Sequence, residues 1–135
     1  MPIIGFKITE IEAKRGKEEE KGIRVGISPP IIKDVKKKKI ALEGVGEVIA
    51  FEFEFLVRYE PIDGKISVKG EVLYEDKRKE EILKEWEKEK RIDNKILIPV
   101  LNFIFRKSII KVLSLADDLQ LPPPLRLPEV VEGRK

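Results

Sequence analysis

A long apolar helix near the end of the chain constrains the fold more than any other segment. Residues 95–119, KILIPVLNFIFRKSIIKVLSLADDL, are followed at once by the proline-rich segment 121–130, LPPPLRLPEV. At about 100° per residue, one side of this helix forms a core-facing stripe of Leu97, Leu101, Ile104, Phe105, Val112, Leu115, Ala116 and Leu119. The opposite side, polar in an ordinary surface helix, carries Ile96, Val100, Phe103 and Ile110. We therefore expect two partners for this helix: the chain's own sheet, and a second subunit, a lid segment or a bound apolar ligand.

The composition narrows the class of protein. At 135 residues the chain is long enough for one domain with a real core, which we place at residues 1–135. The absence of Cys and His removes thiol and imidazole chemistry and the commonest zinc ligands, so we expect no enzyme, no cofactor and no metal site. A net charge of +3 with 39% charged residues indicates interspersed charges and no strong nucleic-acid binding. The abundance of Lys and Glu beside few thermolabile residues is typical of a thermophile.

Neither the N-terminal segment nor the most apolar run predicts secretion or membrane insertion. The first residues, MPIIGFKITEIEAKR, lack the basic, apolar and small-residue regions of a signal peptide. The most apolar run, residues 96–105, is too short to span a bilayer. We expect a soluble, cytoplasmic protein without membrane insertion.

The first half of the chain predicts a sheet. From residue 49 to 59 every odd position is apolar, which indicates a central strand, and Pro61 to Gly64 supply the turn to a partner strand at 66–74. An earlier strand begins at Ile4 and changes its apolar phase after Ile8, which predicts a bulge near Thr9 or Glu10. A short strand at 23–27 ends at Ser28-Pro29-Pro30. The expected fold is α+β, with a four-stranded antiparallel sheet within residues 3–75.

The second half predicts two helices and an extended tail. A mostly solvated helix at 77–90, capped by Asp76, leans on the body through Trp86. The long helix at 95–119 takes Asp93 or Asn94 as its cap, and Pro99 either kinks its first turns or marks where regular helix begins. The tail at 121–131 is extended by its prolines, and its leucines indicate that it packs against something.

Two motifs raise the question of chemistry or nucleic-acid binding. Ser108 and Lys111 have the S-x-x-K spacing of penicillin-binding enzymes, but the companion motifs are absent and Ser108 falls within the apolar helix. The basic run Lys36 to Lys39 fits either a phosphate-binding patch or, as we favour, a solvated loop or an edge strand whose lysines discourage aggregation. No aromatic residue is interleaved with these lysines for base stacking.

The order of antiparallel strands, short helix and long helix resembles the SecB export-chaperone family. The matching positions are Asn94 and residues 95–99 at the start of the long helix, residues 121–128 after it, and Val48 to Val57 in the central strand. This resemblance implies a homotetramer, built as a dimer of dimers, whose hydrophobic grooves hold unfolded preproteins. The chain lacks the family's acidic character, so the bacterial translocase partner is not carried over, and it looks like an archaeal relative.

The predicted function is that of an ATP-independent holdase chaperone that binds non-native polypeptides, with a possible place in protein transport. The apolar residues at loop or non-core positions are the candidates for the client-binding site: Ile31, Ile32, Ile92, Ile96, Phe103, Leu125 and Leu127. Val100, Phe103 and Ile110 are the candidates for an oligomer interface.

Two alternatives remain open on sequence grounds. One is an adaptor or regulatory module of the same fold, such as a toxin-antitoxin companion, which would select one folded partner. The other is weak RNA binding by Lys33 and Lys36 to Lys39, which added salt would weaken steeply.

Overall fold

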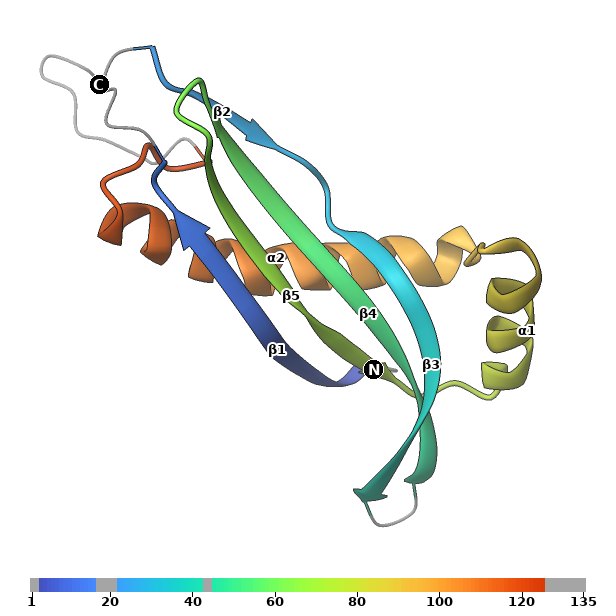
Figure 1. The fold of residues 1–135 in the computed structure, drawn as a ribbon. Helices are drawn as coiled ribbons and strands as arrows, with labels where there is room; N and C mark the ends of the chain where they lie inside the picture. Colours follow the sequence, from blue (N-terminus) through green and yellow to red (C-terminus); the bar gives the residue numbers. More distant parts are fainter. Residues whose placement is uncertain (1–2, 17–21, 43–44, 126–135) are drawn as a thin grey trace, which may run out of the picture.

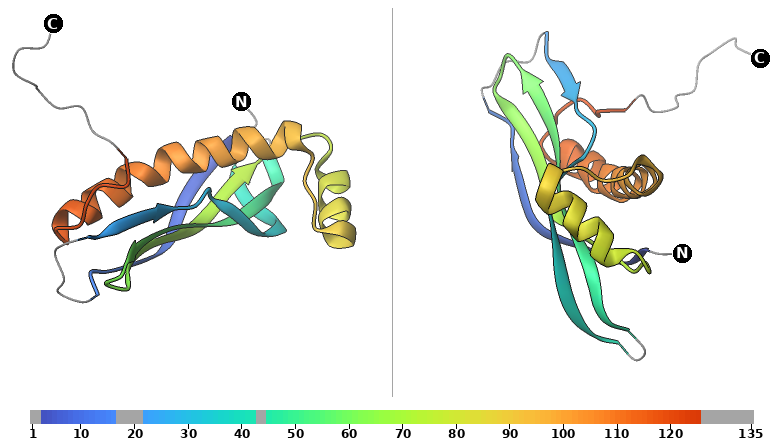
Figure 2. Two further views of the ribbon diagram at one scale, coloured as in Figure 1. Left: turned by 90° about the horizontal axis from the view of Figure 1, so that it is seen from above. Right: turned by 90° about the vertical axis from the view of Figure 1, so that its right-hand side faces the viewer.

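The computed structural model describes residues 3–16, 22–42 and 45–125 of the chain. They form a 5-stranded antiparallel sheet followed by two helices. The sheet is one layer and both helices lie on the same side of it, as the two views in Figure 2 show. The molecule is therefore an α+β protein whose sheet has one helix-covered face and one open face.

A long hairpin lies at the centre of the sheet. It consists of β4 (Val45–Glu60) and β5 (Gly64–Tyr74), which confirms the central strand and the turn predicted from the sequence. Paired residues such as Phe51 and Val72 point to the helix side. The odd positions of β4 make the floor of the core, since all of them are buried: Ile49, Phe51, Phe53, Phe55, Val57 and Tyr59.

Strand β1 (Ile3–Lys14) pairs with β5 and forms one edge of the sheet. Its register shifts between Ile8 and Glu10, which confirms the predicted bulge. Gly70 lies opposite this point, and a Cβ there would come within 2.0 Å of the Lys7 carbonyl oxygen. The close approach of β1 at its bulge thus requires a glycine in β5.

The other edge of the sheet contains two strands in succession. Both β2 (Arg24–Ile27) and β3 (Ile31–Leu42) pair with β4, along its last and its earlier residues respectively (Figure 1). Ser28-Pro29-Pro30 separates them, because proline has no N–H to donate to the ladder. The expectation of four strands was wrong: the lysine-rich segment after Pro30 is a fifth strand.

Helix α2 (Asn94–Asp118) covers the inner face of the hairpin and crosses the strands at a steep angle (Figure 1). The Asp93 side chain accepts a hydrogen bond from the Lys95 backbone N–H at 3.2 Å, which confirms the predicted cap. The helix continues through Pro99. Its buried residues are spaced four apart: Ile96, Val100, Ile104, Ser108, Val112 and Ala116.

This spacing corrects the predicted orientation of α2. We expected Ile96 and Val100 to face away from the core, but both are buried against the chain's own sheet, and Val100 is 1% exposed. The predicted core residues Leu97, Leu101 and Phe105 are only partly buried. Because four residues turn an ideal helix by about 400°, the buried line rotates by about 40° at each step.

Helix α1 (Lys79–Glu89) is shorter than the expected 77–90 and lies beside the N-terminal end of α2. Asp76 does not cap it directly. Its Oδ1 accepts a hydrogen bond from the Arg78 backbone N–H at 2.8 Å, in the turn before the helix. After α2, Leu121 is buried and the Tyr59 hydroxyl donates to the Pro122 carbonyl oxygen at 2.9 Å, so the start of the tail packs as predicted. The rest of the predicted tail, residues 126–131, lies outside the described residues.

Candidate functional site

An apolar hollow of about 410 Å³ lies between α2 and the β2–β3 connection. The helix contributes one side of its surface, since the contributing positions follow an i, i+3, i+4, i+7 spacing. They are Ile98, Leu101, Asn102 and Phe105. The connection contributes Ile27, Ser28, Pro29 and Pro30. None of the described residues that line this hollow is charged.

A second hollow, also about 410 Å³, lies where α1 meets α2. It is lined by Pro30, Ile31, Ile32, Trp86, Lys90, Arg91, Ile92, Asn94, Leu97 and Leu101. Pro30 and Leu101 line both hollows, so the two adjoin along the same side of α2. We call the two hollows together the Pro30 groove.

The break between β2 and β3 creates one wall of this groove. Pro30 is buried, and the residue after it, Ile31, is 51% exposed. On the opposite wall Ile98 is 54% exposed, although it lies in the apolar first turns of α2. The Pro30 groove therefore gathers several of the large exposed apolar side chains of the described chain, namely Ile27, Ile31 and Ile98. Apolar side chains gathered at a hollow mark binding sites more often than the same side chains scattered singly.

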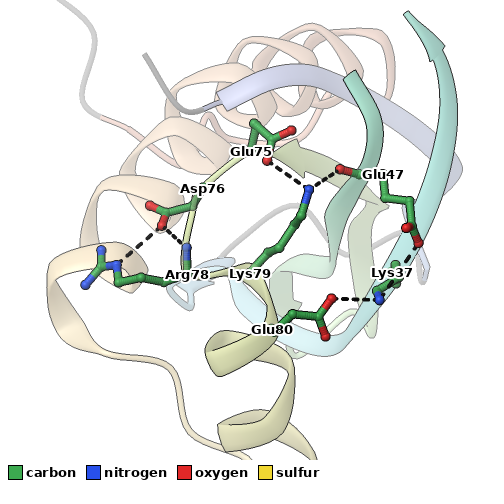
Figure 3. Close-up of polar contacts among 7 residues, drawn as sticks. All are labelled: Lys37, Glu47, Glu75, Asp76, Arg78, Lys79 and Glu80. Atoms are coloured by element: carbon green, nitrogen blue, oxygen red, sulfur yellow. Dashed lines mark hydrogen bonds and ion pairs between the residues drawn. The ribbon is translucent and has the colours of Figure 1, made fainter. Parts of the chain in front are cut away.

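Helix α1 is attached to the sheet edge by polar contacts, which Figure 3 shows at its first turn. Lys37 Nζ on β3 donates to Glu80 Oε1 at 2.8 Å, and Lys79 Nζ donates to the Glu47 carbonyl oxygen at 2.9 Å. The hydrogen bond with Lys37 lowers the pKa of Glu80, and the same contact raises the pKa of Lys37. Further along α1, the Trp86 indole N–H donates to Asp34 Oδ1 at 3.1 Å. These contacts hold the helix that supplies the Trp86 wall of the groove.

The lysines of β3 do not form a free basic patch. Lys36 pairs with Glu52 at 2.8 Å and Lys33 lies 3.8 Å from Glu54. Lys38 hydrogen-bonds Glu71, and Lys37 pairs with Glu80 as described. These lysines lie on an edge strand of the sheet, which confirms the edge strand and not the solvated loop of the two structural interpretations. Carboxylates from neighbouring elements already neutralise most of this charge, which does not favour a phosphate-binding role.

The structure brings some of the predicted client-binding residues together and separates others. Ile31, Ile32 and Ile92 line the second hollow of the groove. Ile96 is buried in the core and is not available to a ligand. Phe103 is half-buried, with its ring 5.8 Å from that of Phe6 on β1, away from the groove. Leu125 is exposed after the helix, outside the groove, and Leu127 lies outside the described residues.

The predicted interface residues are placed differently from one another. Val100 is buried within the chain, so its assignment to an oligomer interface is wrong for this arrangement of the core. Phe103 keeps only part of its surface exposed. Ile110 is 69% exposed on the solvent side of α2 and stays a prediction.

Several groove residues were not predicted from the sequence. Ile27, Pro30, Trp86 and Phe105 were interpreted as a strand end, a strand-ending proline, the contact of a solvated helix with the body, and a core position, and Ile98 was given no individual role. One wall of the groove could have been predicted, because Ile98, Leu101 and Phe105 are spaced so that they lie on one side of the helix. The proline pair that faces them across the groove gave no comparable signal.

The Ser108–Lys111 pair does not form a catalytic site. Ser108 is buried in the middle of α2, and its Oγ has no hydrogen-bond partner. Lys111 is exposed on the same helix. A lysine that makes no hydrogen bond to the serine hydroxyl, and lies in solvent, does not activate it.

The remaining observations add no second site. Among the described residues no cluster of His, Cys, Asp or Glu has an arrangement that would hold a metal ion, and neither described helix is long and apolar enough to cross a membrane. Comparisons with models of protein families, with curated proteins and with solved structures give no match. The Pro30 groove is therefore the candidate functional site of the described chain.

Proposed function

We propose that this protein is an ATP-independent holdase, which binds apolar segments of non-native polypeptides in the Pro30 groove. The observation that carries the proposal is the run of two adjoining hollows with exposed isoleucines on both walls. Binding of this kind requires burial of apolar surface and no chemical step.

The size of the groove supports weak and reversible binding. A short extended segment that buries about 300 Å² of apolar surface gains roughly 7.5 kcal/mol, at about 25 cal/mol per Å². The loss of translational and conformational freedom on binding offsets much of that gain. One groove therefore holds a client weakly, and several grooves on one assembly raise the apparent affinity through avidity.

We further propose a SecB-like, cytoplasmic homo-oligomer, arranged as a dimer of dimers, with a role in protein export or in stress. The order of a strand-rich first half, a short helix and a long helix supports the likeness. Apolar side chains that remain exposed outside the groove support self-association: Ile4 and Ile11 on β1 and Ile110 on α2. Assembly would also supply the multiple grooves that avidity requires.

The decisive experiment is suppression of aggregation. The full-length protein, at equimolar subunits, is expected to slow aggregation of a chemically denatured model substrate as measured by light scattering. Ile98→Asp places a charge in the groove and is expected to abolish most of this activity, because an apolar client would have to bury that charge. The variant should still fold, because the Ile98 side chain is 54% exposed. Ile110→Asp is the matched control, an exposed isoleucine of the same helix outside the groove.

The molecular mass of each variant, measured by light scattering, distinguishes loss of binding in the groove from loss of oligomer assembly. Failure of the unmodified protein to slow aggregation would remove the holdase proposal. Retention of one folded partner, together with indifference to unfolded chains, would instead identify an adaptor or regulatory module.

A further inference from the structure

The two hollows of the Pro30 groove differ in charge. The hollow formed by Ile98 and the proline pair has no charged lining residue, whereas the hollow at the α1–α2 corner is lined by Lys90 and Arg91. Among the described residues, none that lines either hollow carries a carboxylate. A chain laid along both would therefore meet an apolar stretch at one end and two cations at the other.

The positions of these cations follow from the end of α1. Lys90 takes a left-handed conformation with φ 54°, and its backbone N–H donates to the Trp86 carbonyl oxygen at 2.9 Å. Its Nζ lies 5.3 Å from the centroid of the Trp86 ring, a cation–π contact that keeps the ammonium group at the groove wall. Within the part of the chain that the structure describes, neither Lys90 nor Arg91 makes an ion pair.

The carboxylate that accepts the Trp86 indole N–H also has other partners. Asp34 Oδ1 accepts hydrogen bonds from the Trp86 indole N–H at 3.1 Å and from the Val35 backbone N–H at 2.8 Å. Its other oxygen lies 4.0 Å from Lys36 Nζ. Asp93, at the start of α2, accepts from the Lys95 backbone N–H. Asp34 and Asp93 therefore have other partners. Glu81, Glu85 and Asp93 line a separate, smaller hollow that shares Arg91 and Ile92 with the corner, and they do not line the Pro30 groove itself.

We infer that the Pro30 groove selects apolar segments that carry a carboxylate at one end, and that Lys90 and Arg91 recognise this group. The inference rests on the proposed polypeptide-binding function and specifies its substrate class. The carboxylate belongs either to an Asp or Glu side chain or to the C-terminus of the bound chain. Exposed charge pairs contribute modestly, so the expected preference over a matched basic segment is roughly threefold to tenfold.

The lining of the corner favours a peptide over a nucleic acid. Its apolar members are Pro30, Ile31, Ile32, Ile92, Leu97 and Leu101, which suit aliphatic and aromatic side chains. Trp86 is the one aromatic residue in this hollow, and Lys90 lies over its ring. Single-stranded nucleic acids bind where successive bases stack on several aromatic faces.

The chain offers a built-in reporter for a test, because Trp86 is its single tryptophan. The full-length protein is titrated with peptides of roughly nine residues, which extend over about 30 Å. The peptides share one apolar core without Trp or Tyr and end in Glu, Gln or Lys, each with a free or an amidated C-terminus. Anisotropy of a dye on the peptide measures affinity, and a change in Trp86 fluorescence places the peptide at the corner.

The Glu peptide is expected to bind most tightly and the Lys peptide most weakly. At about 0.5 M sodium chloride the three affinities are expected to converge, because salt screens exposed charges while apolar contacts persist. A preference that survives amidation assigns recognition to side-chain carboxylates, and one that requires the free terminus assigns it to the C-terminus.

A charge-reversed variant sharpens the result. Lys90→Glu combined with Arg91→Glu is expected to invert the order of the Glu and Lys peptides. Lys84→Glu combined with Lys88→Glu makes the same change in net charge on exposed positions of α1 that do not line the groove, and is expected to leave the order unchanged. Circular dichroism verifies that both variants are folded.

Three results would overturn the inference in distinguishable ways. Equal affinities for the Glu and Lys peptides, with a Trp86 response, would remove the charge preference and leave the groove as a general apolar site. Absence of binding by every peptide would remove the proposed function as well. Displacement of a bound peptide by a single-stranded RNA oligonucleotide would identify the corner as a nucleic-acid site.

Discussion

The two helices are attached to the same sheet by different forces. Helix α2 buries a continuous line of side chains, from Ile96 to Ala116, over the aromatic floor of β4. Helix α1 fully buries Ile82 alone and packs Leu83 and Trp86 only partly against the core. Polar contacts such as Lys37–Glu80 and Trp86–Asp34 join it to the sheet edge. Burial of apolar area contributes far more free energy than exposed ion pairs do. We therefore expect α2 to separate only on global unfolding and α1 to open locally at lower cost.

The largest expected effect comes from the core of α2. Ile104→Ala removes a side chain that is 0% exposed and is expected to lower the free energy of unfolding by about 2–4 kcal/mol, through lost burial and the cavity left behind. Urea denaturation monitored by circular dichroism measures it. Ile110→Ala, on the exposed side of the same helix, is expected to stay within about 0.5 kcal/mol. Similar losses for both variants would show that α2 packs on a partner through its outer side.

The next largest effect concerns the single buried side chain of α1. Ile82→Ala is expected to reduce the free energy of local opening by about 1–2 kcal/mol, and so to accelerate amide hydrogen exchange in α1 by about fivefold to thirtyfold. Exchange in α2 should be unchanged, and Lys84→Ala, at an exposed position, should alter neither helix. Equal acceleration in both helices would mean that they unfold as one unit.

A smaller effect of opposite sign is expected in the middle of α2. Ser108 Oγ is buried without a hydrogen-bond partner, so Ser108→Ala removes an uncompensated desolvation cost and should stabilise the protein by about 1 kcal/mol. Ser114→Ala, at an exposed position of the same helix, has the same gain in helix propensity and serves as the control. If the two variants gain equally, the buried hydroxyl has a partner in solution.

The smallest effect should appear in the dependence of α1 attachment on pH. Because the pKa of Glu80 is lowered by Lys37, the contact stabilises α1 above the ordinary value of 4.5, and this contribution is lost as pH falls through the lowered pKa. Because the pKa of Lys37 is raised, the contribution is present below 10.5 and is lost as pH rises through the raised pKa. Trp86 fluorescence should follow both changes.

A neutral variant tests this dependence. Glu80→Gln is expected to flatten the acid limb of the Trp86 signal, and Glu81→Gln, one position along, should leave it unchanged. An acid limb that persists in Glu80→Gln would assign it to another group.

Several predictions that rest on local sequence patterns were confirmed, although the Asp76 cap was not. The alternation of β4, the bulge in β1 and the Asp93 cap are local patterns, and each was confirmed. The predicted orientation of α2 was confirmed at Ile104, Val112 and Ala116 but was wrong in the first turns, because we assumed one straight stripe along the helix. Its buried line instead rotates as it crosses a sheet whose strands twist, and the twist beneath a helix is not readable from that helix's own sequence.

Strand β3 was not counted among the predicted strands for a related reason. A strand in contact with the core normally shows apolar residues at alternate positions, but Lys37 occupies such a position, in register with Ile49, and pairs with Glu80 of α1. A tertiary ion pair thus replaces the apolar contact that the pattern requires. The Pro30 groove was predicted only in part, through Ile31, Ile32 and Ile92, because its other wall depends on how far the β2–β3 connection stands from α2.

The proline pair between β2 and β3 also limits how anything can be held beside it. Pro29 and Pro30 have no backbone N–H, so an extended segment lying there cannot add to the sheet as a hydrogen-bonded strand with a fixed register. A segment bound there would be held by side-chain contacts, which do not fix its register and accept many different sequences. The same gap interrupts the edge along which sheets of separate molecules would otherwise pair. Under the proposed function, this break lowers the tendency of a bound apolar segment to nucleate fibrils on the sheet edge.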